Sequence, residues 1–89
     1  MKYTYLVIRD EPREKGVYKY PVLGVHGNLT KALRHYNSVV SDVTKKSVPM
    51  PSRKSLDLKV TDGRFVTVIS YYDSIEETYV RLEKWIVKG

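Results

Sequence analysis

The sequence contains no cysteine and no long apolar run, and these two absences exclude several classes of protein. Without cysteine there is no disulfide, thiolate metal site or thiol nucleophile, so packing alone must stabilise this chain of 89 residues. We expect a reducing, cytoplasmic setting on that basis. The longest uncharged stretches, residues 20–30 and 65–72, are far shorter than the ~20 apolar residues of a membrane-spanning helix. We therefore expect no membrane span and, from the polar first residues, no signal peptide.

The residues that are present describe one small, basic, folded domain. A hydrophobic content of 42% with 29% charged residues is typical of a globular protein. Two independent cores would each be too small to fold unaided, so residues 1–89 are predicted to form a single domain. Sixteen Lys and Arg against ten Asp and Glu give a net charge of +6.

The first quarter of the chain has the pattern of a β-hairpin. Residues 2–9 and 17–25 are rich in β-branched and aromatic side chains, and the charged segment between them contains Pro12 and Gly16. Pro21 cannot donate a ladder hydrogen bond, which predicts a free edge or a bulge in the second strand. A register that paired Tyr5 with Tyr20 would gather four tyrosines on one face, where they could stack on unpaired bases. The alternative is that these tyrosines are ordinary half-buried sheet residues.

A long helix is predicted over residues 28–46. Asn28 is a suitable N-cap, and Val48-Pro49-Met50-Pro51 prevents the helix from continuing. Apolar residues recur at the spacing of one helical face: Leu29, Ala32, Leu33, Tyr36, Val40 and Val43.

The Asp62-Gly63 dipeptide predicts a second hairpin, because it supplies the positive φ angles of a two-residue type I′ turn. This turn would pair Val60 with Phe65, Leu58 with Thr67 and Leu56 with Ile69.

The last segment, residues 74–88, permits two interpretations. Ser74 and Glu77 match a capping box, and Ile75, Tyr79, Leu82 and Ile86 share a helical stripe, so we expect a second, C-terminal helix. Against this, 78–80 and 85–87 consist of strand formers, which leaves open a final strand after a turn at residues 73–74. The predicted fold is α+β, with two hairpins forming a mainly antiparallel sheet in the order ββαββα; the alternative is ββαβββ.

The positive charge is concentrated in residues 28–55, which hold six Lys and Arg against a single Asp, a net +5. This concentration predicts a non-enzymatic binding module that contacts nucleic acid through the phosphate backbone. The predicted contact residues are Lys31, Arg34, His35, Lys45, Lys46, Arg53 and Lys54. The alternative is a protein-interaction or inhibitor module that places the same residues on an acidic or nucleic-acid-binding groove of a larger protein. A homodimer through a free strand edge stays open, although Pro21 disfavours it.

Candidate chemistry is sparse. His26, Gly27 and Asn28 precede the predicted helix, where backbone amides and the helix dipole favour an anion, so they form a candidate anion site. No ligands occur at metal-binding spacing, and we expect no metal, no cofactor and no enzymatic activity. A metal-free, ribonuclease-like reaction using His35 and Arg34 is the enzymatic alternative.

Overall fold

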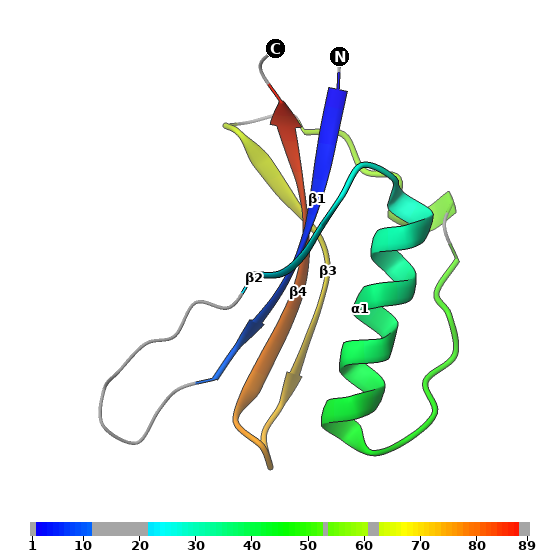
Figure 1. Ribbon diagram of the computed structural model, residues 1–89, viewed down its shortest axis with the longest axis vertical. Helices are drawn as coiled ribbons and strands as arrows, with labels where there is room; N and C mark the ends of the chain where they lie inside the picture. The colour runs from blue at the N-terminus through cyan, green and yellow to red at the C-terminus, as the bar shows by residue number, and fades with distance from the viewer. Residues whose placement is uncertain (1, 12–21, 53, 61–62, 88–89) are drawn as a thin grey trace.

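One helix packs against one face of a four-stranded antiparallel sheet (Figure 1). The computed structural model describes residues 2–11, 22–52, 54–60 and 63–87. The elements in chain order are β1 (Lys2–Asp10), β2 (Val22–His26), α1 (Leu29–Thr44), the 3₁₀ turn η1 (Lys54–Leu56), β3 (Phe65–Asp73) and β4 (Thr78–Val87). The strand order is β2-β1-β4-β3, so the α+β class is confirmed.

The first and last strands form the centre of the sheet. β1 pairs with β4 along its whole length, from Lys2 opposite Val87 to Asp10 opposite Tyr79. β2 and β3 are the edge strands. Pro21, where a free edge or a bulge is predicted, lies outside the described residues. An irregularity in the β1–β2 pairing, between Val7 and Ile8, leaves an extra residue on β2.

The core lies between α1 and one face of the sheet. Tyr5 and Val7 of β1 and Val80 and Leu82 of β4 are at most 8% exposed on this face. The helix contributes the predicted apolar stripe, in which Leu29 is partly buried and the other members are buried: Ala32, Leu33, Tyr36, Val40 and Val43. Val39, which is not part of the predicted stripe, is buried as well. The regular spacing of these side chains explains why this segment is a helix, since each turn adds one or two residues to the same buried face.

Both ends of α1 have a local cause. Asn28 is the N-cap, as predicted, and its side-chain oxygen accepts a hydrogen bond of 3.2 Å from the backbone N–H of Lys31. Lys45 follows the helix in the left-handed conformation, with φ of 60°, so the helix ends slightly before the predicted Lys46. The Asn37 side-chain amide then donates to the carbonyl oxygen of Val48 at 2.7 Å, which holds the following loop against the helix.

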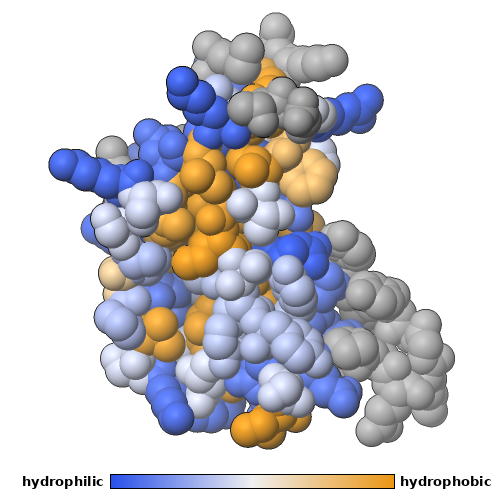
Figure 2. All heavy atoms as spheres, turned by 180° about the vertical axis from the view of Figure 1, so that it is seen from behind, coloured by the Kyte–Doolittle hydropathy of each residue, from blue (hydrophilic) through white to orange (hydrophobic). Residues whose placement is uncertain are grey.

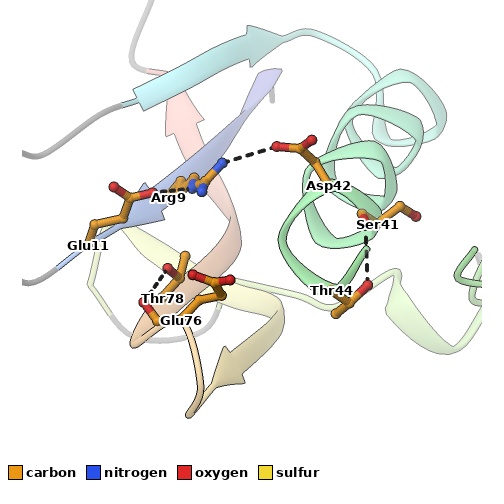
Figure 3. Close-up of polar contacts among 7 residues, drawn as sticks. All are labelled: Arg9, Glu11, Ser41, Asp42, Thr44, Glu76 and Thr78. Atoms are coloured by element: carbon orange, nitrogen blue, oxygen red, sulfur yellow. Dashed lines mark hydrogen bonds and ion pairs between the residues drawn. The ribbon is translucent and has the colours of Figure 1, made fainter. Parts of the chain in front are cut away.

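Polar contacts join the elements at the edge of the core (Figure 3). The Arg9 guanidinium of β1 contacts the carboxylate of Glu11 at 2.6 Å and reaches Asp42 on α1 at 3.4 Å. In the turn between β3 and β4, the Thr78 hydroxyl donates to the carbonyl oxygen of Glu76 at 3.1 Å. The contact between Arg9 and Asp42 ties the sheet to the helix, and the hydrogen bond of Thr78 stabilises the start of β4.

The prediction of a hairpin with its turn at Asp62-Gly63 is wrong. Leu56 belongs to η1, residues 57–60 form no strand, and Phe65 pairs with Trp85 instead of Val60. Residues 61–62 of the predicted turn lie outside the described residues. The ten-residue β4 offers β3 a long partner, whereas residues 56–60 form only a short segment.

The prediction of a C-terminal helix is also wrong. The final strand of the alternative is present, but the described residues form two strands after α1, so their order is ββαββ and not ββαβββ. Instead of a capping box at Ser74, the Asp73 carboxylate accepts hydrogen bonds from the backbone N–H groups of Ile75 at 3.0 Å and Glu76 at 2.9 Å. Glu77 then adopts a positive φ of 52°. The hydrogen bonds to the Asp73 side chain form a turn that reverses the chain direction. The strand-forming residues that follow then extend as β4.

The N-terminal strands pair antiparallel, as predicted, but in another register. Tyr5 lies opposite His26. Tyr3 and Tyr5 contribute to the core beneath α1, so they do not form part of an exposed tyrosine face. Tyr18 and Tyr20 lie outside the described residues.

Candidate functional site

The register defines two ends of the molecule, which carry opposite charge. At the end that we call the upper end, Lys2 lies opposite Val87 and Phe65 opposite Trp85; at the lower end, Asp10 lies opposite Tyr79 and Asp73 opposite Thr78. Helix α1 runs from the upper to the lower end, as Figure 1 shows. Both described chain ends therefore lie at the upper end.

The chain between η1 and β3 also lies at the upper end (Figure 1). The ammonium of Lys84, which is 6% exposed, donates to the carbonyl oxygen of Leu58 at 2.8 Å, and the backbone N–H of Ile86 donates to that of Arg64 at 3.0 Å. Asp57 lines a pocket of about 220 Å³ together with the residues that begin α1. These contacts bring η1 and the residues after it beside the start of the helix.

Exposed cations gather at the upper end as a result. We call this set the upper cations, and all five side chains are solvent-exposed: Lys2, Lys31, Lys54, Lys59 and Arg64. None of them forms an ion pair with another described residue. Asp57, an acidic residue at this end of the described chain, lies 3.6 Å from the ammonium of Lys84.

The lower end is different, because its cations lie among carboxylates. Lys45 and Lys46 follow α1 there, and the β3–β4 turn brings Asp73, Glu76 and Glu77 to the same end (Figure 1). The pKa of the Asp73 carboxyl is lowered chiefly by its hydrogen bond from the Glu76 N–H and in smaller part by the charge of Lys46. The positive charge of Lys45 and Lys46, which the sequence assigns to a single basic surface, is thus opposed by nearby carboxylates.

The structure therefore divides the predicted contact residues. Lys31 and Lys54 lie at the upper end, and Arg34 is exposed one turn further along the helix from Lys31. Lys45 is separated from Lys31 by about 21 Å of helix axis, at 1.5 Å per residue. Arg53 lies outside the described residues.

His35 does not lie on the exposed basic surface. It is half-buried, and its Nδ1 shares a hydrogen bond of 2.9 Å with Nε2 of His26 on β2. The rings meet edge to face, with centroids 5.1 Å apart. Burial, and secondarily the neighbouring His26, lower the pKa of His35. The pair joins β2 to α1.

The polar atoms of the predicted anion site are largely engaged elsewhere. His26 Nε2 is shared with His35, and the Asn28 side-chain oxygen caps the helix. Gly27 and Asn28 line the 220 Å³ pocket, but the carboxylate-bearing Asp57 lines it too, which is unfavourable for an anion. Anion binding here stays a prediction.

Sequence reasoning missed three of the upper cations: Lys2, Lys59 and Arg64. Lys2 is far from Lys59 and Arg64 in the sequence, and the three residues share no regular spacing. The pairing of β1 with β4 and of β4 with β3 brings Lys2 and Arg64 to one end, and the contact of Lys84 with the Leu58 carbonyl oxygen holds the segment of Lys59 there. No local pattern encodes these contacts.

An aromatic pair lies at the same end, on the sheet face opposite α1. Phe65 and Trp85 are stacked, with ring centroids 4.6 Å apart and planes inclined by 13°. Further down this face Arg81 contacts the carboxylates of Asp10 at 2.6 Å and Glu83 at 3.2 Å. The face therefore combines exposed rings with a half-buried ionic network.

Other site chemistry is sparse in the described ranges. They contain no group of three His, Asp or Glu side chains that could hold a metal ion. Nor does any helix in them combine the length and apolar character needed to cross a bilayer. Comparison with protein families, curated proteins and solved structures found no match to this chain. The fold and the site define a small α+β domain with one cationic end.

Proposed function

We propose that this domain binds nucleic acid through the upper cations. The observation that supports the proposal is the gathering of Lys2, Lys31, Lys54, Lys59 and Arg64 at one end of the molecule without an ion pair to any described residue. Ammonium and guanidinium groups that are not held by carboxylates are available to phosphates. The proposed role is binding of the phosphate backbone.

Three carboxylates elsewhere in the molecule are held by other cations and do not compete with phosphates for the upper cations. Asp10 and Glu83 contact Arg81, and Asp42 contacts Arg9. Most of the described carboxylates thus lie in the sheet or at the lower end. At the upper end the exposed carboxylate of Asp57 lies 3.6 Å from the ammonium of Lys84, and the five upper cations leave a positive balance there. Such a separation orients an approaching polyanion toward the upper end.

Binding of this kind is sensitive to salt. Each phosphate that is neutralised releases counterions, so the logarithm of the affinity falls with the logarithm of salt concentration by about 0.7 to 0.9 per contact. A cation that touches phosphate therefore contributes to the slope, and a cation elsewhere does not.

Two double variants of equal charge test the proposal. Lys54→Ala with Lys59→Ala removes two upper cations, and Lys45→Ala with Lys46→Ala removes two lower ones; each lowers the net charge from +6 by two. We expect the first variant to lower the salt slope by about 1 to 2 and to weaken binding, with the second close to wild type. The measurement is fluorescence anisotropy of a labelled oligonucleotide between about 50 and 200 mM salt.

Equal losses in both variants would mean that only net charge matters, and would contradict a site at the upper end. Absence of salt-dependent binding by the wild-type protein would contradict nucleic-acid binding altogether.

A second candidate function is binding to an acidic groove of a larger protein. Apolar side chains interleave with the upper cations, including Leu58, Phe65 and Val87, which are 36%, 42% and 40% exposed. Figure 2 shows apolar side chains gathered in a band across the upper half of the molecule, with strongly hydrophilic side chains beside it. A protein interface needs such an apolar centre.

A pull-down from native extract with and without nuclease separates the two functions. A partner that persists after nuclease treatment and is lost with Lys54→Ala/Lys59→Ala supports the protein partner. Loss of all retained material on nuclease treatment supports nucleic acid.

A further inference from the structure

The Phe65–Trp85 pair is a partly exposed aromatic surface at the cationic end. Phe65 begins β3 and is 42% exposed, and Trp85 lies opposite it near the end of β4. The two rings are nearly parallel, so they form a stacked pair on the sheet face that α1 does not cover. Half-exposed stacked rings are costly to leave in water, which makes them a surface on which another planar group gains by stacking.

A chain of polar contacts fixes the orientation of this pair. The Trp85 indole N–H donates to Oε1 of Glu83 at 3.0 Å, and the other carboxylate oxygen of Glu83 accepts from Nε of Arg81 at 3.2 Å. Glu83 is 6% exposed, so it is held firmly in the sheet. Trp85 is thereby pre-oriented, and a ligand that stacks on the pair pays little ordering entropy.

Cations adjoin the pair on the chain and across the sheet. Arg64 directly precedes Phe65, and its carbonyl oxygen accepts from the N–H of Ile86, the residue after Trp85. Lys2 lies opposite Val87, two residues beyond Trp85. Phosphates bound by these cations would place attached bases beside the rings.

We propose that Phe65 and Trp85 stack on unpaired bases, so that the ligand of this site is single-stranded nucleic acid. This inference rests on the proposed function and adds the class of nucleic acid. In a duplex the faces of the bases are covered by their neighbours, whereas in a single strand they are accessible to aromatic side chains. Stacking is indifferent to base identity, so recognition is broad in sequence.

The same face contains a matched control at the lower end. Tyr72 and Tyr79 lie opposite each other there, with ring centroids 6.3 Å apart, and are 56% and 36% exposed. Arg81 lies over the Tyr79 ring and contacts Asp10 and Glu83. An exposed aromatic pair without the upper cations is not expected to bind a polyanion.

Intrinsic fluorescence tests the proposal in the wild-type protein, because Trp85 is the single tryptophan of the chain. The probes are a 20-mer of thymidylate, a 20-mer of uridylate, a 20-base-pair DNA duplex, and heparin as a polyanion without bases. We expect both single strands to quench Trp85, heparin to bind without quenching, and the duplex to bind more weakly than the thymidylate strand at equal salt. The ratio of thymidylate to uridylate affinity tells whether DNA or RNA is preferred.

Variants then separate the inference from the proposed function. Phe65→Leu should weaken single-strand binding about tenfold while heparin binding is unchanged, since one stacked base is lost. Phe65→Tyr keeps a ring and should retain affinity, and Tyr72→Leu should behave as wild type. Circular dichroism verifies the fold of each variant.

If the wild-type protein binds duplex as tightly as single strands, or if Phe65→Leu binds normally while Lys54→Ala/Lys59→Ala is impaired, stacking is overturned and the proposed function stands. If no nucleic acid binds the wild-type protein, both are overturned.

Discussion

At the scale of single residues, the contact between Gly24 and the histidine pair joins β2 to the helix. A Cβ atom at Gly24 would lie 2.4 Å from Nδ1 of His35 and 2.9 Å from Nε2 of His26. The absence of a side chain at this position therefore allows His35 to reach His26 and form their hydrogen bond. The sequence marks both histidines, but it does not show that one glycine makes their contact possible.

Gly24→Ala is expected to destabilise the fold by about 1 to 3 kcal/mol, because the added methyl group overlaps the His35 ring. Gly27→Ala is the control: its Cβ would have no neighbour within 4 Å, and a change within about 0.5 kcal/mol is expected. Urea unfolding followed by circular dichroism measures both. A Gly24→Ala protein as stable as wild type would show that the two rings shift apart at no cost.

The same pair makes stability depend on pH. Burial, and then His26, lower the pKa of His35 from its ordinary 6.5, so the unfolded chain binds more protons than the folded one at mildly acidic pH. The contribution of neutral His35 to the free energy of unfolding should be fully present above pH 6.5, and it should be lost as the pH falls through the lowered pKa of His35. Carboxyl groups, with ordinary pKa values near 4, titrate mostly below this window.

Urea midpoints at pH 7.5 and 5.5 measure this dependence, and His35→Asn should have a smaller decrease than wild type. An equal decrease in the two proteins would assign the effect to other groups.

At the scale of elements, the C-terminal segment shows how a side chain decides between helix and strand. Ile75, Tyr79, Leu82 and Ile86 share a helical stripe, yet the Asp73 carboxylate binds the amides of Ile75 and Glu76 and turns the chain. The later residues then pair with strands on both sides. Both Glu83 and Lys84 are 6% exposed, so this central strand buries charged groups on its two faces. A strand of this kind lacks the alternation by which strands are recognised.

The ionic network on β4 yields a prediction at this scale. Arg81→Met leaves Asp10 and Glu83, each 6% exposed, as nearby carboxylates without their cation. We expect a loss of about 3 kcal/mol in the free energy of unfolding. Arg9→Met removes two more exposed ion pairs, with Glu11 (29% accessible) and with Asp42 (69% accessible), and should cost less than Arg81→Met, about 1 kcal/mol.

Thermal and urea denaturation of the two arginine variants give this comparison. Adding Asp10→Asn to Arg81→Met should recover part of the lost stability, because one unpaired charge is removed. Equal losses in Arg81→Met and Arg9→Met would contradict a special role for the buried network.

At the scale of the whole molecule, the fold converts a charge concentrated in the sequence into a charge separated in space. Residues 28–55 carry most of the net charge, but α1 extends from the upper to the lower end and divides it. Strand pairing then adds Lys2 and Arg64 to the upper end and brings the acidic β3–β4 turn to the lower one. The contact of Lys84 with the Leu58 carbonyl oxygen holds the segment of Lys59 at the upper end. The salt-slope comparison of the two double lysine variants belongs to this scale, since the variants differ only in where the charge is removed.

The sequence by itself determined the local structure of α1 and the α+β class. The stripe from Ala32 to Val43 and the Asn28 cap depend on neighbours within one or two turns, so the helix could be predicted with nearly correct ends. The excess of positive charge and the absence of cysteine follow directly from composition.

Only the tertiary structure decided the sheet order and the site. The pairing of β1 with β4 joins residues about 80 positions apart, and the choice of β4 over residues 56–60 as the partner of β3 is a competition between non-local contacts. Such contacts depend on which long segments bury most area together, and local periodicity does not report that. The same pairing puts Phe65 beside Trp85 and gathers the upper cations, so the candidate binding site exists only in the folded chain.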